Sequence, residues 1–162
     1  MKSFVAAACM IGLAFVGKAE ADGFVWTLAD VSGVCEKVIV NGRSDTCSQK
    51  ADGGSGLIYT HLPNGRVFLT LGLVGGRILS FVGEKDSQPE PTKYWLYLSR
   101  VRFGSKATET VANVGGTCIV TMSPDAATWY NVECQGSGEH GATFQIGFHP
   151  DGKRVVPHYV KH

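Results

Sequence analysis

Residues 57–82, LIYTHLPNGRVFLTLGLVGGRILSFV, decide the fold class. Three short runs rich in Val, Ile, Leu, Thr and Phe are separated by Pro-Asn-Gly and by Gly-Gly. Val, Ile, Thr and Phe favour strands, while asparagine and glycine accept the positive φ of tight turns. The stretch therefore predicts three antiparallel strands over residues 57–62, 66–73 and 78–82.

The same pattern of short apolar runs and turn residues continues through the rest of the chain. It predicts further strands over residues 24–28, 36–40, 94–103, 117–122, 129–133, 143–148 and 154–158. No long helical periodicity competes with it, although residues 105–113, between glycines, could form a helical turn or two. The longest polar break is expected over residues 84–93. The fold class is all-β, an antiparallel sandwich or small barrel of about eight to ten short strands.

The start of the chain has the features of a secretory signal peptide. Lys2 is followed by an apolar stretch over residues 4–17 and by the small-x-small pattern Ala19-Glu20-Ala21. We expect cleavage of residues 1–21, a single all-β domain over residues 22–162, and a periplasmic or secreted location. The apolar stretch is shorter than the roughly 20 residues of a membrane-spanning helix, so no transmembrane segment is expected in the mature chain. Cys9 lies inside the apolar stretch, which does not suit lipid attachment.

The charge of the mature chain argues against nucleic acid as a partner. Cleavage after Ala21 leaves thirteen basic and thirteen acidic side chains, with both signs mixed along the sequence. Proteins that bind nucleic acid carry a basic stripe that pairs with the phosphate backbone, and the sequence has none.

Four cysteines remain after cleavage, and an even number in an oxidising compartment favours two disulfides. Cys35 and Cys47 flank the turn-forming pair Asn41-Gly42, and Cys118 and Cys134 flank the turn-like residues 123–128. Hairpins at these turns would bring each pair together, so we predict the local bridges Cys35–Cys47 and Cys118–Cys134. The alternatives are a zinc site of four thiolates or a redox pair, but no C-x-x-C is present.

An internal repeat is a further hypothesis. Cys47 precedes Pro63-Asn64-Gly65-Arg66 by the same 16 residues that separate Cys134 from Pro150-Asp151-Gly152-Lys153. Two similar halves would give this spacing, and so would chance recurrence of a favoured hairpin turn.

Strand 94–103 supplies the candidate binding residues, because it is apolar on both faces at one end. Strict alternation places one set of residues on one face: Trp95, Tyr97, Val101 and Phe103. The other face then carries Tyr94, Leu96, Leu98, Arg100 and Arg102. A central sandwich strand explains this pattern, and so does a barrel strand lining an apolar lumen. The candidates for binding are Trp95, Tyr97, Phe103, Arg100 and Arg102.

The histidines near the C-terminus are weak candidates for a metal site. His140, His149 and His158 follow one another at intervals of nine residues, which matches no compact ligand motif. The glycine-flanked Ser55 and Ser137 lack the G-x-S-x-G pattern of a nucleophile elbow. No catalytic constellation and no cofactor are therefore predicted.

These features together predict an exported, non-enzymatic β domain that acts by binding to an envelope or extracellular protein. The first alternative is a β-barrel that carries a small ligand in its lumen. The second is a small hydrolase or metal-binding protein that uses the C-terminal histidines.

Overall fold

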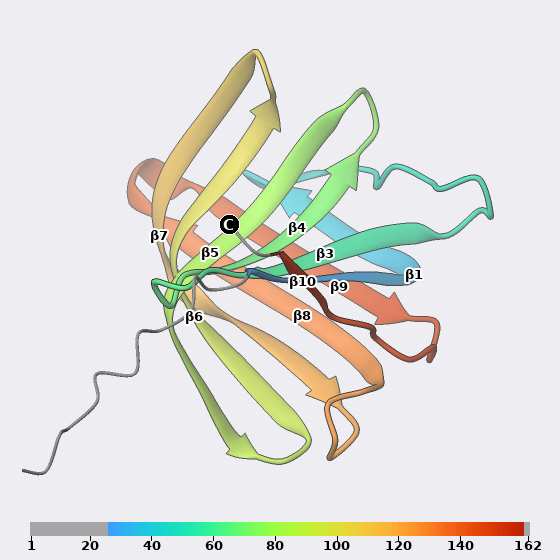
Figure 1. The fold of residues 1–162 in the computed structure, drawn as a ribbon. Helices are drawn as coiled ribbons and strands as arrows, with labels where there is room; N and C mark the ends of the chain where they lie inside the picture. The colour runs from blue at the N-terminus through green and yellow to red at the C-terminus, as the bar shows by residue number, and fades with distance from the viewer. Residues whose placement is uncertain (1–25, 161–162) are drawn as a thin grey trace, which may run out of the picture.

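The computed structural model describes residues 26–160, which form a closed antiparallel β-barrel (Figure 1). Eight strands make the barrel, and the short strands β2 and β10 are additions to it. The all-β prediction is confirmed, with a barrel rather than a sandwich. The predicted signal peptide, residues 1–21, lies outside the described residues. The elements are β1 (Trp26–Val40), β2 (Arg43–Ser44), β3 (Ser55–His61), β4 (Val67–Leu73), β5 (Arg77–Glu90), β6 (Lys93–Ser105), β7 (Thr108–Met122), β8 (Trp129–Gly138), η1 (Glu139–Gly141), β9 (Thr143–Pro150) and β10 (His158–Val160).

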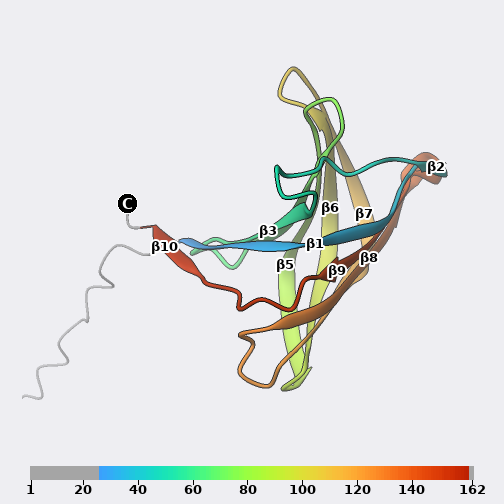
Figure 2. The same cartoon turned by 90° about the vertical axis from the view of Figure 1, so that its right-hand side faces the viewer.

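Strand β1 closes the barrel by pairing with two different strands. Its first half pairs with β3 as far as Gly33, and its second half pairs with β9 from Gly33 onward. A side chain at Gly33 would overlap the backbone of His149 and Pro150, so the close approach of β1 and β9 requires glycine. Figure 2 shows β1 running across β5 and β6 rather than along them. The barrel is therefore closed at the point where β1 changes partner.

Alternating side chains from all eight barrel strands fill the interior. In β4, Val67, Leu69, Leu71 and Leu73 are each at most 1% exposed, and the residues between them face outward. The other strands contribute residues of the same kind, and together they form one hydrophobic cluster. Its largest fully buried members outside β4 include Leu57, Leu79, Phe81, Leu96, Val101, Val120, Val132 and Phe148.

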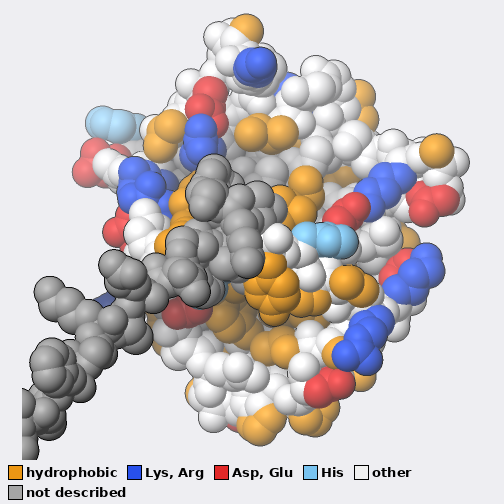
Figure 3. Space-filling model, viewed as in Figure 1, with side chains coloured by type: hydrophobic (Ala, Val, Ile, Leu, Met, Phe, Trp, Pro, Cys, Tyr) orange, Lys and Arg blue, Asp and Glu red, His pale blue; other side chains and the backbone are white. Residues whose placement is uncertain are grey.

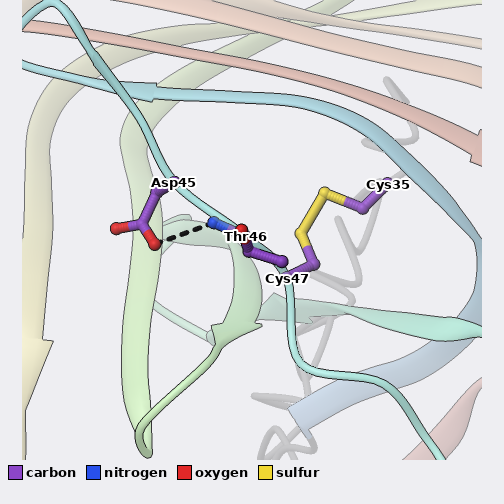
Figure 4. Close-up of a disulfide and its surroundings, with 4 residues drawn as sticks. All are labelled: Cys35, Asp45, Thr46 and Cys47. Carbon is purple, nitrogen blue, oxygen red and sulfur yellow. Dashed lines mark hydrogen bonds between the residues drawn. A yellow bond between two sulfur atoms is a disulfide. The ribbon is translucent and has the colours of Figure 1, made fainter.

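The structure confirms both predicted disulfides. Cys118 and Cys134 are direct cross-strand partners in the β7–β8 hairpin. Cys35 of β1 is bonded to Cys47, which follows β2 (Figure 4). This disulfide, together with the hydrogen bond at 2.9 Å from the backbone N–H of Ser48 to the carbonyl of Gly72 in β4, holds the connection after β2 against the barrel wall. In the chain-entropy model, each bridge of this loop size stabilises the fold by about 3 kcal/mol.

Two local predictions are wrong. Residues 105–113 form no helix, because Ser105 ends β6 and Thr108 begins β7 in a tight hairpin. Threonine and valine in this segment favour strand geometry, and Arg102 forms an ion pair with Glu109 across it. Residues 84–93 are not a loop, because β5 continues to Glu90 through several bulges. This end of β5 extends beyond the hydrophobic core, so its residues are polar. In the sequence, a polar strand of this kind resembles a loop.

Other strand boundaries also differ from the expectation. The predicted strands 24–28 and 36–40 belong to the single strand β1, whose described part begins at Trp26. The predicted strand 154–158 is mostly an extended connection that ends in β10. In the hypothesised repeat, Pro63-Asn64-Gly65 makes the tight turn between β3 and β4, whereas Pro150 ends β9.

The variant Gly33→Ala tests the closure of the barrel. The added methyl group would overlap the β9 backbone, so we expect the free energy of unfolding to fall by about 2 to 4 kcal/mol. The control is Gly147→Ala on β9, where the nearest atom to an added Cβ is Lys37 Cβ at 3.6 Å, an ordinary contact. Urea unfolding of both variants measures the difference. Equal midpoints for the two variants would contradict the proposed role of Gly33.

Candidate functional site

A β-bulge in β6 determines which residues of this strand face outward. In the pairing of β6 with β5, Leu98 faces Gly83 and Arg100 faces Val82, so Ser99 between them is an extra residue. Leu96 and Leu98 are buried before this residue, and Val101 is buried after it. The bulge adds one residue to the strand, so the alternation changes phase. The expected grouping of Trp95 and Tyr97 with Val101 and Phe103 is therefore wrong.

The outward residues of β6 form one strip, which we call the β6 strip: Trp95, Tyr97, Arg100 and Arg102. The rings of Trp95 and Tyr97 are neighbours, with centroids 6.4 Å apart. Tyr97 is 41% exposed, and its hydroxyl lies 3.3 Å from Ser87 Oγ. Within the described residues, the ring N–H of Trp95 is buried and has no hydrogen-bond partner. The aromatic end of the strip therefore combines exposed ring surface with an unused donor.

The arginine end of the strip borders a hollow of about 210 Å³ on the outside of the barrel. Its apolar part comes from Phe68, Val82 and Val111. Val82 does not belong to the core cluster, yet it is only 3% exposed. Surrounding side chains on the outer wall cover it. This surface is therefore apolar beneath a rim of arginines.

Two glutamates hold the three arginines around this hollow. Arg66 and Arg100 both donate to Glu84 Oε1, at 3.0 and 2.7 Å. Arg102 donates to Glu109, and this hydrogen bond lowers the pKa of the Glu109 carboxyl. Three guanidinium groups face two carboxylates, so the cluster carries one net positive charge at neutral pH.

Phe103, the remaining candidate of this strand, lies elsewhere. It is partly buried and packs against the hydrophobic core. The guanidinium carbon of Arg77 lies 5.8 Å from its ring centroid, a cation–π contact. Arg77 also donates two hydrogen bonds to Asp45, at 2.7 and 2.8 Å. Phe103 therefore belongs to a structural cluster that ties the connection after β2 to the start of β5.

A second hollow, the end pocket, lies where β3, β5 and β7 finish, and it has a volume of about 300 Å³. Its aromatic part is built around Tyr59, whose ring makes edge-on contacts with Trp129 at 5.7 Å and with Tyr94 at 6.3 Å. Val155 and Pro157, from the connection between β9 and β10, form the opposite part. Figure 3 shows hydrophobic side chains gathering near the centre of one face, with charged side chains towards its margins.

The phenols of the end pocket are held in the neutral form. Burial is the main cause that raises the pKa of Tyr94, and the nearby Tyr59 and Asp86 add to it. Burial also raises the pKa of Tyr59. The Tyr94 hydroxyl donates to Asp86 Oδ2 at 2.9 Å.

The histidine candidates lie on different turns and strand ends. His140 is in η1, His149 is in β9 and His158 begins β10, and all three are exposed. Within residues 26–160, no group of three or more His, Cys, Asp or Glu side chains is placed to hold a metal ion. The structure therefore does not bring these histidines together.

Sequence reasoning missed the end pocket and the hollow beside the β6 strip. Tyr59 and Trp129 come from β3 and β8, and only barrel closure makes them neighbours. Arg66 and Phe68 lie near Arg100 because β5 pairs with both β4 and β6, and Val82 of β5 is the register partner of Phe68 and of Arg100. No local spacing signals such contacts.

No family model matches this chain, and it matches no curated protein and no solved structure.

The raised tyrosine pKa values predict a loss of stability in alkali. The folded chain keeps Tyr94 protonated while the unfolded chain ionises near its ordinary pKa, so stability is complete below about pH 10 and falls above it. Urea unfolding at pH 8 and pH 10.5 measures this loss. It should be smaller in Tyr94→Phe than in the wild type, and unchanged in Tyr130→Phe, which alters an exposed phenol. Equal losses in both variants would contradict the assignment to Tyr94.

Proposed function

We propose that this chain is an exported, non-enzymatic binding domain that contacts a protein in the envelope or outside the cell through the β6 strip. The observation that carries the proposal is the placement of Trp95, Tyr97, Arg100 and Arg102 along the outer face of one strand. Tryptophan, tyrosine and arginine are the residue types that dominate binding energy at protein interfaces.

The chemistry of the strip favours a partner with an acidic, partly apolar surface. The Trp95 and Tyr97 rings offer apolar area at low entropic cost, because each has only two side-chain torsions. The arginine cluster with its net positive charge complements a negative patch and speeds encounter with it.

The filled interior supports recognition by the outer surface. Side chains from all barrel strands occupy the space that a lumenal carrier would need for its ligand. The two disulfides fit an oxidising compartment, where such bonds persist. Among residues 26–160, no helix has the length and apolar character needed to span a bilayer.

Photo-crosslinking tests the strip as the contact surface. The crosslinking residue benzoylphenylalanine replaces Tyr97 in one variant and Tyr130 of β8 in the other, both exposed tyrosines. The proposal predicts an adduct with one polypeptide from position 97 in the native host, and none from position 130. Adding Arg100→Glu and Arg102→Glu should weaken the adduct at least fivefold, as expected for the loss of about 1 kcal/mol or more. Equal adducts from both positions, or none from position 97, would refute the strip as the interface.

Export predicts a defined mature product. The chain recovered from its native host should begin at Asp22 and leave no cysteine open to thiol reagents until a reductant is added. Intact mass spectrometry before and after alkylation measures both features. A chain that keeps Met1 and alkylates at all four downstream cysteines would contradict export.

A further inference from the structure

The end pocket has the size and composition of a small-molecule site. Its volume of about 300 Å³ is at the lower end of the range for such sites, which are mostly apolar with a few polar groups. Tyr59, Tyr94 and Trp129 supply aromatic surface, and Met122 adds an adaptable thioether. The pocket is separate from the β6 strip, since it shares no lining residue with that strip.

The chain itself holds the outer part of this pocket in position. The backbone N–H of Val155 donates to the carbonyl of Ala127 at 2.7 Å, and Arg154 forms a β-bridge with Thr128. Strand β10 then pairs with β1 at Trp26–Leu28. These contacts fix the segment from both sides, so the site is formed before a ligand arrives and less binding energy is lost to ordering.

The polar groups of the pocket have acceptor capacity to spare. Tyr94 uses its proton in the hydrogen bond to Asp86 and also interacts with the Tyr59 hydroxyl, which leaves its oxygen one lone pair to accept with. Gln88 donates from Nε2 to the carbonyl of Pro91 at 3.0 Å, which leaves its Oε1 able to accept. A ligand with one hydroxyl or N–H group could donate it to either of these two acceptors.

Charge at the pocket selects a neutral ligand. The residues that line it include no lysine or arginine to pair with an anion, and the Asp86 carboxylate beside Tyr94 repels one. The lining residues also include no carboxylate, and Asp86 already accepts the hydrogen bond from Tyr94, so a cation would find no direct ion-pair partner among the pocket walls. We propose that the end pocket binds a small, neutral, mostly apolar ring compound that carries one hydrogen-bond donor.

The test uses the full mature chain and 2-naphthol, a neutral two-ring molecule with one hydroxyl group. Two adjacent positions give matched variants: Val155 lines the pocket, whereas Val156 is 56% exposed. Val155→Trp should fill the pocket and weaken binding at least tenfold, while Val156→Trp should change it less than twofold. Calorimetric titration measures both, after circular dichroism has shown that each variant is folded. Equal affinities for the two variants, or no saturable binding to the wild type, would overturn the proposal.

Naphthalene, which lacks a hydroxyl group, tests the hydrogen bond to Tyr94. The wild type should bind 2-naphthol at least fivefold more tightly than naphthalene, because only 2-naphthol has a donor, and Tyr94→Phe should reduce this preference. An unchanged preference would remove Tyr94 as the acceptor.

Two further measurements keep the proposal testable if Val155→Trp does not fold. In the wild type, nuclear Overhauser effects should connect the naphthol ring with the Met122 methyl group and the Trp129 ring. Contacts elsewhere on the chain would overturn the assignment. If naphthol binding is lost as the protein concentration rises, a second copy of the chain occupies the pocket. That result would also overturn the proposal.

Discussion

The pairing of β1 with two strands is the constraint on which the rest of the structure depends. Up to Gly33 this strand extends the sheet through β3, and beyond Gly33 it joins β9. Without the second pairing, β9 would present a long unpaired edge, which exposes a sheet to aggregation. The glycine matters because β1 and β9 approach so closely that no side chain fits between them. Closure therefore depends on the smallest residue in the strand.

Closure also determines where function can reside. A ring of eight strands with leucine, valine and phenylalanine directed inward leaves its interior to its own side chains. Recognition is then limited to the outer wall and to the two ends. The bulge at Ser99 in β6 places the two aromatic residues and the two arginines in one outward strip, whereas an unbroken strand would have divided them between both faces. The aromatic residues of the end pocket come together only because closure brings β3, β6 and β8 to one place.

The sequence was sufficient for the fold class and for the covalent cross-links. Alternation in residues 67–73 and glycine-rich turns indicate antiparallel strands, because both are local properties. Asn41-Gly42 and the turn at residues 123–128 identified the cysteine pairs for the same reason. Closure was not predictable, since it requires knowledge that residues 33–40 face residues 144–150. The phase change in β6 was missed because Ser99, at the bulge, differs little from an ordinary strand residue.

Long-range nuclear Overhauser effects along β1 test the closed barrel most directly. The account predicts backbone contacts from residues 27–33 to β3 and from residues 34–40 to β9, both in one monomeric species. Contacts from only the first half, with the amides of β9 exchanging rapidly on the side that faces β1, would show an open sheet. That result would contradict the closure on which the end pocket depends.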